Sequence, residues 1–153
     1  MENTYLTALK ESLEKKIEIL EKIHIKDEEQ LEIAKSPNFR YDEFDKNAEE
    51  KGVLIYKLNK LDEGFETVYE KVRDELNANK AAYASEIKTM QALIGRITDL
   101  STKIQAEEAR NKAAVERAIK VERDKIKAQR SGIKAIQSYT KTMKSTKSPY
   151  GDI

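Results

Sequence analysis

Residues 5–23 read YLTALKESLEKKIEILEKI, and their apolar side chains recur every three or four positions. This spacing places the large aliphatic residues on one face of an α-helix. That face consists of Leu6, Leu9, Leu13, Ile17, Leu20 and Ile23. A second, thinner stripe of isoleucines indicates that the helix packs against two neighbours. We therefore expect a first helix over residues 4–35, with Asn3 or Thr4 as its N-cap.

Two polar breaks divide the rest of the chain. At Ser36-Pro37-Asn38 the proline disfavours helical geometry in the residue before it, and Ser36 can cap a second helix. The second break is Asn77-Ala78-Asn79, where asparagine tolerates a turn. The predicted fold is all-α: an antiparallel three-helix bundle or coiled coil with a long C-terminal helix. Its segments are a bundle over residues 1–120 with helices at about 4–35, 38–76 and 83–120, a C-terminal extension of the third helix over 121–144, and a flexible tail over 145–153.

The composition excludes several classes of protein. The 153 residues include no Cys, no Trp, one His, five Gly and two Pro. Disulfides, cysteine-based zinc sites and thiol catalysis are therefore excluded, and so few turn residues argue against an all-β fold. No run of about 18 apolar residues predicts a membrane span, and the first residues lack the pattern of a signal peptide. A cytoplasmic location is the resulting expectation.

The net charge of +1 is a sum of unlike parts. Residues 1–76 carry a balance of −7, residues 77–109 a balance of 0, and residues 110–153 a balance of +8. At about 1.5 Å per residue, an unbroken third helix spans about 90 Å, against about 57 Å for the second. Because short connections favour antiparallel neighbours, we expect the third helix to run back along the second and to outrun it near residue 120. The extension keeps an apolar stripe and much of the basic charge.

Catalysis, metal binding and nucleic-acid binding are not expected. Glu21 and His24 match the Glu-x-x-His spacing of di-iron bundles, but the chain has no second histidine. Asp27 and Glu28 could join His24 in a weak surface metal site, although a half-exposed histidine beside acids is the preferred interpretation. We expect no metal, no cofactor and no catalytic residues, because a slender bundle offers its carboxylates no cleft. The basic residues of the C-terminal part look spread around the helix, and only Tyr139 could stack on a base, so no nucleic-acid partner is predicted.

Two polar residues, Glu108 and Asn111, lie on the apolar seam of the third helix. A buried asparagine can fix the register of a helical bundle at a cost in stability. Alternatively, the seam is wet at this point because the bundle is ending. The sequence leaves both interpretations open.

The chain resembles the FlgN family of flagellar export chaperones. The resemblance is carried by YLTALKESLEKKIEILEKI at the start, by KGVLIYKLNKLDEGF over residues 51–65, and by LIGRITDLSTKIQAEEARNKAAVERAI over residues 93–119. Asn111 matches a helix-interior asparagine of the family. The chain departs from the pattern at Gly52 and Gly64 and in its unusually basic end. The resemblance covers roughly residues 5–140.

What the resemblance implies is a cytoplasmic chaperone, not an enzyme, that holds flagellar hook–filament junction proteins before type III export. In that family the C-terminal helical region is taken to bind the client, and export-apparatus components are further partners that the resemblance allows. A homodimer is left open. The alternative function is a coiled-coil structural or adaptor protein of a larger assembly. The expected partner-binding residues are Ile119, Ile126, Ile133, Ile136, Tyr139 and Met143.

Overall fold

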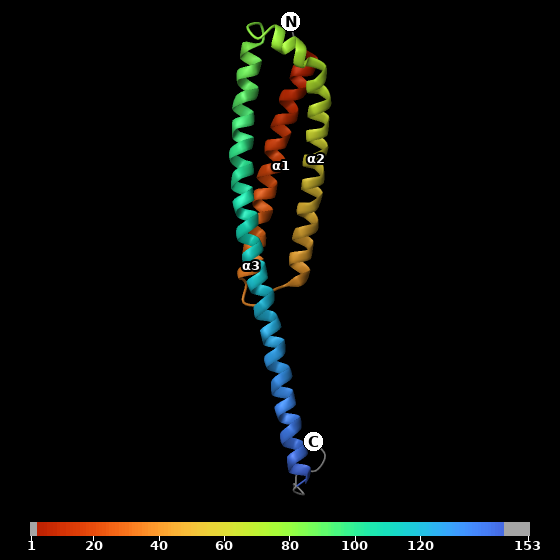
Figure 1. Cartoon of the computed structure of the whole chain (residues 1–153), viewed down its shortest axis with the longest axis vertical. Helices are drawn as coiled ribbons and strands as arrows, with labels where there is room; N and C mark the ends of the chain where they lie inside the picture. Colours follow the sequence, from red (N-terminus) through yellow and green to blue (C-terminus); the bar gives the residue numbers. More distant parts are fainter. Residues whose placement is uncertain (1–2, 146–153) are drawn as a thin grey trace.

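The computed structural model describes residues 3–145 and contains three helices (Figure 1). These are α1 over Thr4–Lys35, α2 over Tyr41–Ala78 and α3 over Ala84–Ser145. No strand occurs within residues 3–145. The predicted all-α three-helix bundle is therefore confirmed. Apart from Ser145, which ends α3, the predicted tail lies outside the described residues.

Helix α1 is the centre of the bundle, because it packs against both of the other helices. Its apolar face is buried from Leu6 to Ile23. The main core cluster joins that face to Val72 and Leu76 of α2 and to Met90 and Ile97 of α3. The expectation that α1 packs against two neighbours is confirmed, but one apolar face of α1 contacts both of them, and Ile25 of the thinner stripe is exposed.

As expected, the third helix runs back antiparallel to the second, but it packs against α1 and not against α2. Helices α2 and α3 each lie against α1, and their backbones do not approach one another. In Figure 1, α1 runs down from the N-terminus, α2 returns upward and α3 runs down again. Helix α2 is thus antiparallel to both others, whereas α3 is parallel to the helix that it contacts. Past the turn between α1 and α2, α3 extends beyond both of the other helices to Ser145.

The helix boundaries follow local hydrogen bonding and packing. As expected, the Asn3 side chain caps α1 by accepting hydrogen bonds from the backbone N–H groups of Tyr5 and Leu6. The expectation that Ser36 caps the second helix is wrong, because Ser36 is the C-cap of α1 and α2 begins only at Tyr41. The chain stays non-helical until then because Phe39 is buried in a second apolar cluster with Ala34, Ala114 and Val115.

Helix α2 continues unbroken through both of its internal glycines, Gly52 and Gly64. Neither position would bring an added Cβ within 4 Å of a neighbouring atom. Within residues 3–145, none of the helices combines the length and the apolar content that crossing a membrane requires.

Candidate functional site

The expected partner-binding residues fall into three environments. Ile119 is half-buried and packs against the second apolar cluster, so the chain itself already covers part of this side chain. Ile126, Ile133, Ile136 and Tyr139 are exposed, with 48% to 66% of their surface open to solvent. Met143 belongs to α3, but its side chain lies outside the part of the structure that is described.

The bundle ends at two contacts between α3 and the turn that joins α1 to α2. The Glu122 carboxylate accepts a hydrogen bond from the Phe39 backbone N–H at 3.4 Å. The Lys125 ammonium donates to the Pro37 carbonyl oxygen at 3.2 Å. Every residue from Arg123 to Tyr139 is exposed. We call residues 126–145 the overhang, a helix of about 30 Å that projects beyond the turn (Figure 1).

A layer of buried polar side chains separates the two apolar clusters, and a lysine of α2 lies at its centre. The Lys51 ammonium lies 3.2 Å from Asp27 Oδ1 on α1 and 2.8 Å from Glu108 Oε1 on α3. It also donates to Gln30 Oε1 at 3.4 Å. Lys51 therefore links all three helices, including the two whose backbones do not pack together.

Amide side chains complete this polar layer. Asn111 is fully buried, and its Nδ2 donates to the Asp27 carbonyl oxygen at 2.7 Å and to Gln30 Oε1 at 3.1 Å. Gln30 in turn donates to Asn47 Oδ1, and Asn47 donates to the Lys26 carbonyl oxygen. Of the two interpretations of Asn111, the structure supports the buried residue that fixes register, because its bonds form only in one alignment of α1 and α3.

The Asp27 carboxyl is the group of this layer with the most strongly shifted pKa. It is fully buried, and Oδ2 has no hydrogen-bond partner. Burial, together with a hydrogen bond that a protonated Asp27 shares with Glu108, raises the pKa of Asp27 to about 7, although Lys51 opposes the shift. Burial also acts to raise the pKa of Glu108, but the bonds from Asp27 and Lys51 outweigh it and lower that pKa.

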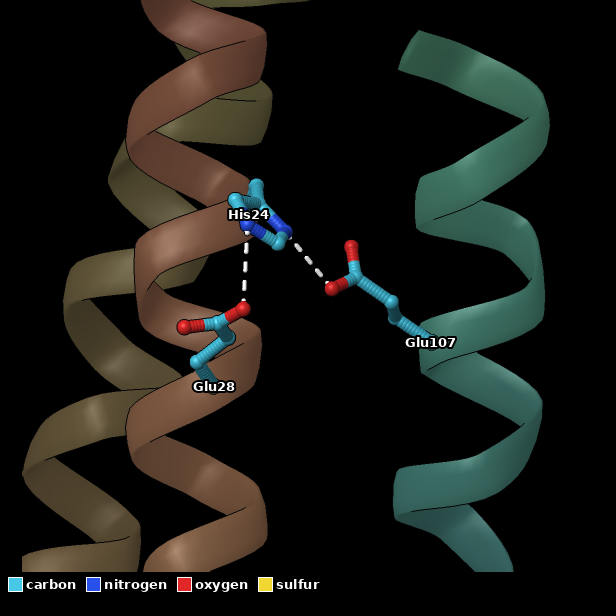
Figure 2. Close-up of side chains that lie close together, drawn as sticks. All are labelled: His24, Glu28 and Glu107. Carbon is cyan, nitrogen blue, oxygen red and sulfur yellow. Dashed lines mark hydrogen bonds and ion pairs between the residues drawn. The ribbon is translucent and has the colours of Figure 1, made fainter. Parts of the chain in front are cut away.

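His24 lies at the edge of this layer and bridges two carboxylates (Figure 2). Its Nδ1 is 2.6 Å from Glu107 Oε2, and its Nε2 is 3.1 Å from Glu28 Oε1. These three groups are close enough to hold a cation. The two ring nitrogens face different carboxylates, which is the arrangement of a hydrogen-bonded bridge between α1 and α3. Glu107 was missed because it comes from another helix, and Asp27 turns away toward Lys51.

A small pocket lies where the overhang leaves the bundle. It has a volume of about 270 Å³ and lies between the α1–α2 turn and α3. Two cations, Lys35 and Arg117, lie at this pocket, and no ion pair of either is seen within residues 3–142. We call it the root pocket. Its apolar lining comprises Ala34, Pro37, Phe39, Ala114, Ala118 and Val121.

Comparison of the chain with family models, with curated proteins and with solved structures finds no match in any of the three. The resemblance to the FlgN family therefore remains a sequence-based expectation. The functional assignment has to rest on that resemblance and on the geometry described above.

Proposed function

We propose that this protein is an export chaperone that binds an amphipathic terminal helix of flagellar hook–filament junction proteins before type III secretion. The observation that carries the proposal is the overhang, a helix with exposed isoleucines on which every residue from Ile126 to Tyr139 is open to solvent. Large apolar side chains that gather on an exposed surface are typical of protein interaction sites. The resemblance to the FlgN family independently points to the same C-terminal helix.

Binding is favoured over catalysis by what the polar groups do. The buried Asp27 carboxylate pairs with Lys51, Asn111 donates to the Asp27 backbone carbonyl, and Gln30 accepts from Lys51. These bonds hold the three helices together. A layer of this kind specifies how the helices align, and so it fixes where the overhang leaves the bundle. We infer that the bundle is the rigid support and that the overhang is the binding element.

The stalk form of the adaptor alternative is less consistent with the fold. A stalk would extend its helices end to end, whereas the breaks at residues 36–40 and 79–83 fold this chain back on itself. An adaptor that presents the overhang to some other assembly is distinguished from a chaperone by what it binds.

Co-expression with hook–filament junction proteins tests the proposal. We expect the full chain to copurify with a junction protein, and a chain truncated after Lys125 to lose it. This truncation removes the overhang but retains both contacts at the turn, so the bundle should stay folded. A double variant, Ile133→Asp with Ile136→Asp, should also lose the client. The matched control, Ile25→Asp with Val53→Asp, changes isoleucine and valine side chains that are equally exposed on α1 and α2. Equal recovery of the client by all four proteins would contradict the proposal.

A further inference from the structure

The overhang carries charges of one sign only, all of them positive. From Ile126 to Ser145 the chain contains five Lys or Arg residues and no Asp or Glu. Two overhangs placed side by side would therefore bring like charges together without compensation. This disfavours the overhang of a second copy as the surface that covers the exposed isoleucines.

The cations of this helix are not evenly spread, contrary to the impression from the sequence. Five of them follow one another at spacings of three, four, three and four residues, which places them on one flank of α3. Arg130 is about 40° around the helix from Ile126, so this flank borders the apolar stripe. We call the five residues the cationic ridge: Lys120, Arg123, Lys127, Arg130 and Lys134.

The root pocket lies at the upper end of the same surface. Val121, which lines it, is half exposed and stands one helical turn before Lys125. The α1–α2 turn closes the pocket on the side of the bundle through Pro37 and Phe39. A helix that lay along the overhang would meet this turn and could place a side chain in the pocket.

We propose that the partner is an acidic amphipathic helix that covers the isoleucines of the overhang, faces its carboxylates toward the cationic ridge and inserts one bulky apolar side chain into the root pocket. The inference rests on the proposed function for the kind of partner, and it adds the partner's charge and its anchor. Charge complementarity supplies orientation and association rate, while the buried apolar anchor supplies most of the binding energy.

The two other polyanions that a basic helix can meet fit less well. A nucleic acid would pair its phosphates with the ridge but leave the isoleucines exposed, and Tyr139 is the sole aromatic side chain of the overhang. Helices that lie on anionic membranes carry Trp, Phe or Leu on their apolar face, and the overhang has none of these.

Two synthetic 20-residue helical peptides test the inference, one with leucines flanked by glutamates and one with lysines in place of the glutamates. Their binding to the full chain is measured by fluorescence anisotropy at about 50 mM and about 300 mM salt. Phosphatidylcholine–phosphatidylglycerol vesicles and a DNA duplex serve as the competing polyanions. Ridge variant Arg123→Glu/Arg130→Glu is compared with control Lys10→Glu/Lys22→Glu, which changes the net charge equally at exposed sites on α1. Val121→Glu tests the pocket at an exposed position.

We expect the glutamate peptide to bind at least about tenfold more tightly than the lysine peptide, with an affinity that falls at the higher salt. The ridge variant should lose this preference, the control should keep it, and Val121→Glu should weaken binding about tenfold. Equal binding of both peptides, binding of neither, or a preference for vesicles or DNA would overturn the inference. If the variant Arg123→Glu/Arg130→Glu still captures a junction protein as wild type does, the proposed function stands and this inference is overturned. If the glutamate peptide binds in a ridge-dependent way but no junction protein is captured, this inference stands and the proposed function is overturned.

Discussion

Replacing Asp27 by Asn should raise the free energy of unfolding relative to wild type as the pH rises from mildly acidic to alkaline. Asp27 is fully buried, and its pKa of about 7 lies well above the ordinary value of 3.8. The folded state therefore holds a proton that the unfolded chain has released. A carboxyl with a raised folded pKa stabilises the protein at low pH, and this stabilisation is lost as the pH rises from about 4 to about 7.

The magnitude follows from the two pKa values. A difference of about three pH units between the folded and unfolded states corresponds to about 4 kcal/mol in the free energy of unfolding. Between about pH 5 and pH 8, the linkage relation assigns about 2 to 3 kcal/mol of this to Asp27. The lowered pKa of Glu108 has the opposite sign, but its effect falls mainly below pH 5 and leaves this window to Asp27.

Urea unfolding of wild type and of Asp27→Asn at about pH 5 and pH 8 provides the measurement. We expect the variant to gain about 2 to 3 kcal/mol on wild type between the two conditions, because Asn cannot ionise and has nearly the same shape. Asp99→Asn, at an exposed position of α3, is the control and should show no such gain. A stability difference between wild type and Asp27→Asn that is the same at both pH values would refute the assignment.

Three further predictions concern the bundle and the overhang. Asn111→Ala removes two buried hydrogen bonds to oxygens of α1 and should lower the free energy of unfolding by about 2 to 3 kcal/mol, measured by urea denaturation. Gly52→Ala and Gly64→Ala should each raise it by about 0.5 to 1 kcal/mol in thermal unfolding, since both sites are helical and sterically open. Ile133→Asp with Ile136→Asp should alter it by no more than about 0.5 kcal/mol, because both side chains are exposed. A large loss of stability in that double variant would show that the overhang packs on the bundle.

The arrangement of α1 could be predicted from sequence because local rules determine it. The spacing of its leucines specified the buried face, and Asn3 could be recognised as a cap from its residue type and position. Pro37 correctly marked the first break. The start of α2 was misplaced because the burial of Phe39 against residues more than 70 positions away overrides the local preference for a helix there.

The polar layer shows where sequence patterns stop being informative. Glu108 and Asn111 could be recognised as polar residues on an apolar seam, but Lys51 could not, because a lysine among glutamates and aliphatic residues looks like a solvated charge. Its burial depends on Asp27 and Glu108, which come from two other helices. Such a site is defined by tertiary proximity, and periodicity along one helix does not reveal it.

The overhang was predicted from helix lengths alone, but the helix against which α3 packs was not. The third helix, if unbroken, is about 90 Å long and the second about 57 Å, which predicted that the third extends beyond the second from about residue 120. The structure places the last contacts of α3 with the α1–α2 turn at Glu122 and Lys125. The same comparison paired α3 with α2, because helix lengths do not show that one apolar face of α1 contacts both of the other helices.

The central claim is that the exposed stripe of the overhang is the client-binding surface. The most direct measurement is the affinity of a junction protein's terminal helix, by isothermal titration calorimetry, for wild type, for Ile133→Asp/Ile136→Asp and for Ile25→Asp/Val53→Asp. We predict at least about a tenfold loss of affinity for the overhang variant and an unchanged affinity for the control pair. An affinity that the overhang variant shares with wild type would contradict the claim.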